Sequence, residues 1–281
     1  MGPATIVCIR NFISGALLVS WAVWRGKSFP RGRDLWLTGL YGILTIGIGN
    51  GTLAVAELWT PTGLASLFIT TGPFLYAGMD AVMPGGERLH GPTIAGLLVG
   101  FLGVLGLVAP AAWTLLSGGQ FDSGGGIVLG FLVLQFSGAC WALGSLLQRN
   151  RKVSTHPFVI AGVQQVFTGV AFIVPAMLEP QDAAWTTRGL AAVVYLAIFG
   201  GVVGYGCYMT ALNRLPLAIV SIYTYVNPVV AVFLGWVAYR EPFGVREAAA
   251  MAVIFLGVWL VRRASVAAQK LRAHGPAQSG R

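Results

Sequence analysis

Nine apolar runs of about 20 residues each, separated by short turns, dominate this sequence. A helix needs about 20 apolar residues to cross the hydrocarbon core of a bilayer. Only 10% of the residues are charged, against roughly a quarter in soluble domains. The sequence therefore predicts an all-α integral membrane protein with nine transmembrane helices that lie in a lipid bilayer. The runs are 3–24, 35–56, 63–83, 92–113, 127–147, 157–178, 189–211, 217–239 and 247–262.

The basic residues predict the orientation of these spans. Most Lys and Arg residues lie in alternate loops (25–34, 84–91, 148–156 and 212–216) and in the C-terminal tail. The positive-inside rule assigns these segments to the cytoplasm. We therefore expect a multi-pass protein of the plasma (inner) membrane, with its C-terminus cytoplasmic and its N-terminus outside. Because the basic residues flank spans, the net charge of +9 does not indicate nucleic-acid binding.

The sequence also matches itself at a shift of about 155 residues. The segment AELWTPTGLASLFITTGP lies over ALNRLPLAIVSIYTYVNP, with two prolines and a serine in register. An odd number of spans separates the two units, so they insert with opposite orientations, as in many secondary transporters. The matched pairs include Ala56 with Ala211, Pro3 with Pro157, Gly15 with Gly169, Arg10 with Gln164, and Gly103 with Gly257.

Several motifs resemble the EamA-type transporters of the drug/metabolite transporter superfamily. These are RNFISG at 10–15, a P-x4-S-x6-P helix in each half, and the similar repeat endings at 86–108 and 240–261. The resemblance implies a ten-helix fold of two inverted five-helix repeats, which exports or exchanges small metabolites. This chain matches that fold with four plus five helices.

The repeats predict the domain organisation. We expect a first EamA-type repeat of four helices at 1–113, an extracytoplasmic linker at 114–126, a second repeat of five helices at 127–263, and a disordered cytoplasmic tail at 264–281. The first helix of the first repeat has no counterpart. A complete repeat would begin about 20 to 30 residues before Met1. We expect the genomic reading frame to continue upstream through an apolar stretch resembling 127–147.

Polar side chains inside the spans are the candidates for substrate binding, because they are costly to bury in a bilayer. The alternative for each is a helix-to-helix hydrogen bond, typically worth about 0.6 kcal/mol. Proline has no backbone N–H, so the carbonyl four residues before it loses its helical hydrogen bond. Polar residues just before Pro73 and Pro228 lie close to such a free carbonyl. The resemblance implies that the second, third, fifth, seventh and eighth spans form the cavity. The candidates there are Asn50, Thr70, Thr71, Gln135, Trp141, Tyr205, Tyr208, Tyr223 and Asn227.

Two charged residues are further candidates, for substrate binding or proton coupling. Arg10 lies about seven residues inside the first span, where it faces an anionic substrate or serves as a structural residue. Its repeat counterpart Gln164 favours a shared scaffold role. Glu57 lies at the outer end of the second span; it couples protons if desolvated and is otherwise an ordinary solvated carboxylate.

No enzyme motif, cofactor motif or metal-ligand spacing is present in the sequence. We expect a secondary-active transporter of small metabolites, and more specifically an exporter, working by alternating access. The alternative is a truncated subunit or scaffold that does not transport, and a membrane-embedded enzyme ranks last. The expected partners are a small-molecule substrate, the lipid bilayer and a second copy of the chain in a homodimer.

Overall fold

The structure is a computed structural model. Every regular element among its described residues is a helix, which confirms the predicted all-α class. The span expected at 217–239 lies almost wholly outside those residues, as do Tyr223 and Asn227. The described residues are 2–84, 91–116, 121–151, 153–180, 185–215, 220, 230, 237, 240 and 244–273.

Among the described residues, five helical stretches are long and apolar enough to cross a membrane. They agree closely with the first, second, fifth, sixth and seventh predicted spans. Shorter apolar helical segments, 94–103 and 248–261, lie within the fourth and ninth. The five stretches are Pro3–Trp24, Arg33–Ala56, Gly126–Asn150, Pro157–Leu178 and Thr187–Arg214.

The chain divides into two compact units, and each combines segments from both halves of the sequence. Unit 1 comprises residues 1–58 and 136–220, and unit 2 comprises 59–135 and 221–281. Helix α7 (Phe121–Asn150) contributes to both. The remaining helices of unit 1 are α1 (Pro3–Trp24), α2 (Arg33–Gly42), η1 (Ile43–Asn50), α3 (Gly51–Ala56), α8 (Pro157–Ala171), α9 (Ile173–Leu178), α10 (Thr187–Tyr195), η2 (Leu196–Tyr205) and α11 (Gly206–Arg214).

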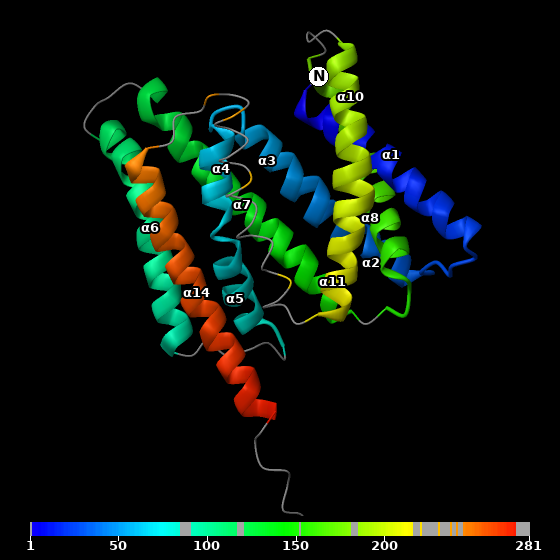
Figure 1. The fold of residues 1–281 in the computed structure, drawn as a ribbon. Helices are drawn as coiled ribbons and strands as arrows, with labels where there is room; N and C mark the ends of the chain where they lie inside the picture. The colour runs from blue at the N-terminus through cyan, green and yellow to red at the C-terminus, as the bar shows by residue number, and fades with distance from the viewer. Residues whose placement is uncertain are drawn as a thin grey trace, which may run out of the picture. The chain divides into compact units, whose positions relative to one another are not determined.

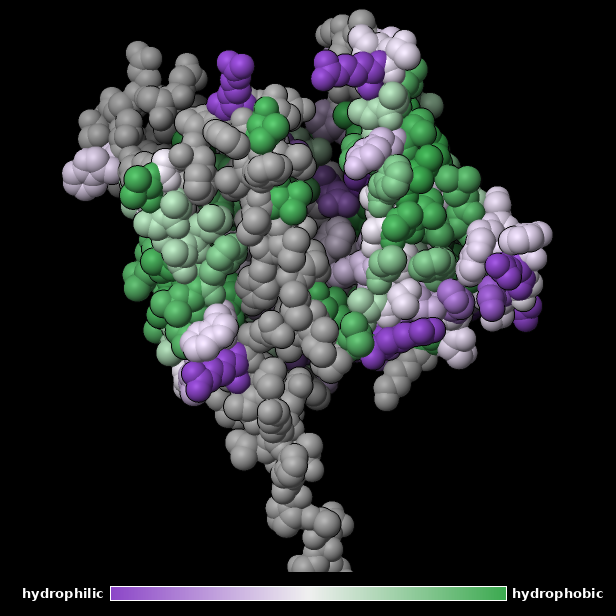
Figure 2. Space-filling model, in the orientation of Figure 1, coloured by the Kyte–Doolittle hydropathy of each residue, from purple (hydrophilic) through white to green (hydrophobic). Residues whose placement is uncertain are grey.

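In unit 1, α8 is the central helix and contacts α1, α2, η1 and α11 (Figure 1). Two matched glycines allow its close approach to α1. A Cβ on Gly15 would lie 2.8 Å from the backbone nitrogen of Val166, and one on Gly169 would lie 3.1 Å from the ring of Phe12. On the face shown in Figure 2, hydrophobic residues cover the middle of the unit 1 helices and hydrophilic residues gather near their ends.

A carboxylate from α9 caps the start of α1. Glu179 accepts hydrogen bonds from the backbone N–H groups of Ala4 (2.9 Å) and Thr5 (3.0 Å) and from the Thr5 hydroxyl (3.1 Å). The first N–H groups of a helix have no intrahelical acceptor, and a negative charge there is favourable. Glu179 therefore connects the ends of two neighbouring spans. No local pattern in the sequence indicates this role.

At the opposite end of unit 1, residues of the loops 25–34 and 148–156 lie close together. The charge pattern assigned both loops to the cytoplasmic side. Arg151 donates to Asp34 through Nη2 (2.6 Å) and Nε (3.0 Å), and these hydrogen bonds raise the pKa of the guanidinium. His156 accepts from the N–H of Phe158 at the start of α8. Burial lowers the pKa of His156, and the charges of Lys27 and Arg214 lower it further.

Unit 2 contains α4 (Thr62–Ile69), α5 (Gly72–Val82), α6 (Gly91–Leu116) and α14 (Val245–Ala273). Helices α6 and α14 lie side by side (Figure 1) and have the most extensive contact of any pair among the described helices.

The observed helix boundaries differ from three of the predicted ones. The third span is two helices, α4 and α5, because the chain turns at Thr70 and Thr71 before Pro73. Helix α14 continues through Ala273, so the first part of the predicted disordered tail is helical, consistent with its Ala, Lys, Leu, Gln and Arg residues. Helix α7 begins at Phe121, inside the predicted linker.

The orientation prediction is testable by cysteine labelling, because a small membrane-impermeant maleimide reaches only one side of sealed vesicles. We expect Arg31→Cys to react only from the cytoplasmic side and Asp122→Cys only from outside, each in a background without the three native cysteines. Cys207 must be replaced because it is exposed. Labelling of both positions from the same side would contradict the predicted topology.

Candidate functional site

Two π-helical segments lie at positions that the self-match of the sequence aligns. Segment η1 ends at Asn50 and η2 ends at Tyr205, and a glycine follows each. A π-helix contains wider turns than an α-helix, and such segments occur frequently at functional sites. The shift that aligns Ala56 with Ala211 also aligns these two end residues. Both were candidate substrate-binding residues from the sequence alone.

Three of the predicted residues form an aromatic cluster in unit 1. The ring of Trp141, on α7, meets Tyr205 edge-on with centroids 6.1 Å apart and lies 5.3 Å from Tyr208. The two tyrosine rings are stacked, with centroids 5.8 Å apart and planes inclined by 29°. Such ring pairs are favourable beyond the area that they bury, so the three side chains hold one another in place.

Two hydrogen-bonded chains extend from these rings. The Trp141 indole N–H donates to the Tyr208 hydroxyl (3.2 Å), which donates to Ser145 Oγ (2.7 Å). The Tyr205 hydroxyl donates to Gln164 Oε1 (2.5 Å), and Gln164 Nε2 donates to Gln148 Oε1 (3.0 Å). The cluster therefore offers ring faces, hydroxyls and amides, and these groups carry no formal charge.

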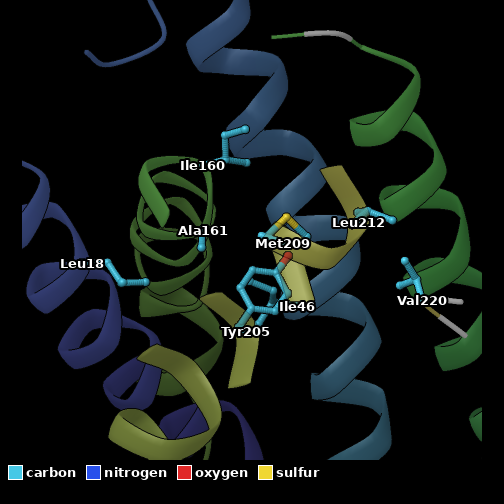
Figure 3. Packing of buried hydrophobic residues seen from close by; sticks show 8 residues of the cluster. All are labelled: Leu18, Ile46, Ile160, Ala161, Tyr205, Met209, Leu212 and Val220. Carbon is cyan, nitrogen blue, oxygen red and sulfur yellow. The ribbon is translucent and has the colours of Figure 1, made fainter. Parts of the chain in front are cut away.

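The two hydrogen-bonded chains differ in how deeply their side chains are buried. Gln164 and Gln148 are completely or almost completely buried, and Tyr205 is 6% exposed, whereas Trp141 and Tyr208 are half-buried. Among the described residues, the Gln148 amide nitrogen has no hydrogen-bond acceptor. Figure 3 shows the apolar side chains around Tyr205, including Ile46 and Met209. Trp141 and Tyr208 are thus the more accessible members of the cluster.

A second group of predicted residues meets in unit 2. Thr71 Oγ1 lies 2.7 Å from Gln135 Oε1 and 2.8 Å from the Phe68 carbonyl, and Gln135 Nε2 donates to that carbonyl (3.2 Å). Thr70 donates to the carbonyl of Leu67. At the break between α4 and α5, the carbonyls of Leu67 and Phe68 thus have hydroxyl and amide partners.

The remaining predicted residues lie outside both groups. Asn50 is half-buried at the end of η1, Glu57 is exposed at the end of α3, and Arg10 is partly buried on α1. The roles proposed for them in substrate binding or proton coupling stay predictions. Tyr223 and Asn227 lie outside the described residues.

Three residues that hydrogen bonds join to the cluster were not among the predicted site residues: Gln164, Gln148 and Ser145. Gln164 was noted only as the counterpart of Arg10 in the repeat. Ser145 and Gln148 follow Trp141 on α7 by four and seven residues, which is the spacing of one helix face. This spacing could have indicated that Ser145 and Gln148 lie on the same helix face as Trp141.

Comparisons with known proteins agree with this architecture. The chain is 28% identical over 263 residues to the "Uncharacterized inner membrane transporter YedA" of Escherichia coli (strain K12), covering 92% of this chain and 81% of that protein. It is 30% identical over 168 residues to the "Probable amino-acid metabolite efflux pump" of the same strain, covering 55% and 52%. A solved crystal structure with 23% identity superposes with a TM-score of 0.67, over 93% of this chain and 89% of that one, and therefore shares its fold.

The family comparison identifies the class of protein. The model of the EamA-like transporter family matches residues 1–109 and 128–263. The relatives are named as transporters and the helices are apolar, so the molecule is a multi-pass membrane protein and the names point to a transporter and not to an enzyme. This chain belongs to the EamA-like transporter family, within the drug/metabolite transporter superfamily.

Proposed function

We propose that this protein is a secondary-active exporter of small metabolites and that the aromatic cluster of unit 1 contacts the substrate. The observation that carries the proposal is the arrangement of Trp141, Tyr205 and Tyr208, which joins three rings to amide and hydroxyl groups inside a membrane protein. Apolar binding sites with a few well-placed polar groups are typical of small-molecule recognition. Similarity to a relative named as a probable amino-acid metabolite efflux pump supports export.

We further propose that transport occurs by alternating access between two inverted repeats. Matched contacts support the repeat: a Cβ on Gly103 would meet the Ile254 nitrogen and the Ala250 carbonyl, and one on Gly257 would meet the matched atoms of Gly100 and Gly96. Each of the two glycines thus meets the same backbone atoms of the other helix. A two-fold axis between the repeats would produce such a reciprocal pair of contacts. The compact bodies available to move are units 1 and 2, each of which combines helices of both repeats.

The export proposal is tested with Tyr208→Phe. Loss of its hydroxyl removes the hydrogen bonds to Trp141 and Ser145 while keeping the ring. We expect metabolites exported by cells overexpressing the protein to fall roughly fivefold, equivalent to about 1 kcal/mol, with unchanged amounts of protein in the membrane. The readout is the set of metabolites that accumulate outside these cells compared with cells that carry an empty vector.

Tyr195→Phe is the matched control. Tyr195 lies on the same chain segment but is 60% exposed, so removal of its hydroxyl should leave export unchanged. Equal loss of folded Tyr208→Phe protein would assign the cluster a structural role. The alternative that the chain is a scaffold without transport activity predicts no export by the purified polypeptide in vesicles. The homodimer stays a prediction.

A further inference from the structure

Gln165 on α8 holds a backbone carbonyl of the π-helical segment η2. Its side chain is 1% exposed, and its Nε2 donates to the Gly201 carbonyl (3.2 Å). Its Oε1 accepts from the hydroxyl of Ser14 on α1, which is completely buried. A buried amide with both a donor and an acceptor partner is costly to disrupt. Gln165 therefore ties η2 to α8 and α1 at one point.

The Gly201 carbonyl lies where the hydrogen-bonding pattern of η2 changes. In a π-helix each carbonyl accepts from the N–H five residues later, and in an α-helix from the N–H four residues later. A continued π pattern would direct the N–H of Gly206 to Gly201, but this N–H donates to the carbonyls of Val202 and Val203. A buried carbonyl needs a donor. The Gln165 amide supplies one to Gly201 at the end of the π pattern.

The glycine at position 201 permits this contact. A Cβ there would lie 2.8 Å from Gln165 Oε1 and 2.5 Å from the Cβ of Ser14, so a larger residue would push both side chains away. Small residues allow such close approach between helices in a membrane. The sequence thus combines a wide turn, a glycine and a buried amide at one place of unit 1.

The preceding residue of α8 holds η2 at a second point. Gln164 accepts from the hydroxyl of Tyr205, which is the last residue of η2. Adjacent glutamines thus contact two successive turns of η2. One residue corresponds to about 100° of helix rotation, so replacing one π turn by an α turn would rotate Tyr205 relative to Gly201 by about 100°. The two glutamines can hold both points only while η2 keeps its π form.

We propose that Gln165 is a positioning residue of the candidate site: it keeps η2 in its π form and thereby directs Tyr205 and Tyr208 toward the third ring of the aromatic cluster. Without the amide, the Gly201 carbonyl gains a donor by adopting the α pattern, in which the N–H of Tyr205 points to it. The two rings then leave Trp141 while the helices stay folded. The inference rests on the proposed function for the contact of these rings with substrate, but the rotation itself does not depend on transport.

The test is Gln165→Met, which keeps the length of the side chain and removes its amide. We expect the backbone amides of η2 to exchange with deuterium about fivefold faster in detergent-solubilised protein, because η2 loses one buried hydrogen bond worth about 1 kcal/mol. Amides of η1 in the same sample should exchange as in the native protein. In the described part of the chain, the hydrogen bonds of the Gln165 side chain go to Ser14 and Gly201 and not to η1.

A fluorotyrosine at position 208 reports where the ring lies. Its fluorine-NMR resonance depends on the indole of Trp141, whose centroid is 5.3 Å from that of the Tyr208 ring. Trp141→Phe measures how far the resonance moves when the indole is absent. We expect Gln165→Met to move the resonance in the same direction, because the ring at 208 rotates away from Trp141.

Two variants make the test specific. Asn11→Leu removes an equally buried amide, which donates to the Val7 carbonyl of its own helix (2.8 Å). It should leave both the exchange of η2 and the resonance at 208 unchanged. Gln165→Asn keeps an amide at the position but is one methylene too short to reach Gly201, so it should behave as Gln165→Met does.

Native exchange in η2 of Gln165→Met would overturn the proposal. Equal acceleration in η1 and η2 would also overturn it, because it indicates a general loss of stability. Faster exchange with an unmoved resonance would assign Gln165 to the stability of η2 and not to the position of the rings, which contradicts the proposal as well. Export is measured separately: unchanged export in a variant whose ring has moved would count against the proposed function and not against the positioning by Gln165.

Discussion

We expect Gly257→Val to abolish most of the folded protein. A Cβ at position 257 would overlap the backbone nitrogen of Gly100, lie 2.5 Å from its Cα and lie 2.7 Å from the Gly96 carbonyl. These are backbone atoms of α6, which cannot move aside like a flexible side chain, so α6 and α14 must separate. Overpacking of a tight interior costs about 1–3 kcal/mol even where side chains can adjust. For Gly257→Val we expect a loss of unfolding free energy of about 3 kcal/mol or more, because backbone atoms are in the way.

The measurement is the yield of monodisperse protein after extraction in mild detergent, together with its thermal stability. Gly106→Val is the matched control, because a Cβ there has no atom within 4 Å although Gly106 lies on α6 as well. Gly103→Val should resemble Gly257→Val, since its Cβ would lie 2.9 Å from the Ile254 nitrogen. Normal yield of Gly257→Val would show that α6 and α14 do not cross at these glycines.

The second large effect is expected from Gln164→Leu. Gln164 accepts from Tyr205 and donates to Gln148, and all three side chains are buried. The substitution removes two buried hydrogen bonds and leaves the polar atoms of Gln148 in an apolar surrounding. Each buried polar group that loses its partner costs about 1–3 kcal/mol, so we expect a loss of about 2–4 kcal/mol of unfolding free energy. Titration with sodium dodecyl sulfate in mixed micelles measures this loss.

A double-mutant cycle separates this network from general packing. Tyr205→Phe should destabilise the native sequence but have a smaller effect in the Gln164→Leu background, since the bond that it removes is already absent. Equal effects in both backgrounds would show that the two side chains do not interact. Export should fall in both single variants, because Tyr205 contacts both Trp141 and Tyr208.

Much of the helical arrangement was predictable from local pattern. Five predicted spans match apolar helices, because the length needed to cross a bilayer is set by the run of apolar residues itself. The break at Thr70 and Thr71 was predictable from Pro73, which lacks a backbone N–H. Trp141, Tyr205 and Tyr208 were chosen as polar or aromatic residues inside spans, and the structure brings the three together.

Other features depend on contacts between residues far apart in the chain. The capping of α1 by Glu179 joins residues 175 positions apart, and no local pattern indicates it. The pairing of Gln164 with Tyr205 depends on the packing of α8 against α11, which directly follows Tyr205 and places two separate buried polar groups within hydrogen-bond distance.

The amino-acid sequence alone determined the membrane class and most spans, because these follow from hydrophobicity along the chain. It also predicted a repeat, from self-similarity, and a list of candidate residues, from polar groups and prolines inside the spans. Only the tertiary structure decided that the compact units mix both halves of the chain and that Gln164 and Gln148 extend the aromatic cluster. Helix pairing in a membrane depends on close approach at small residues and on a few polar contacts. Those contacts join distant parts of the chain and leave only a weak pattern in the sequence.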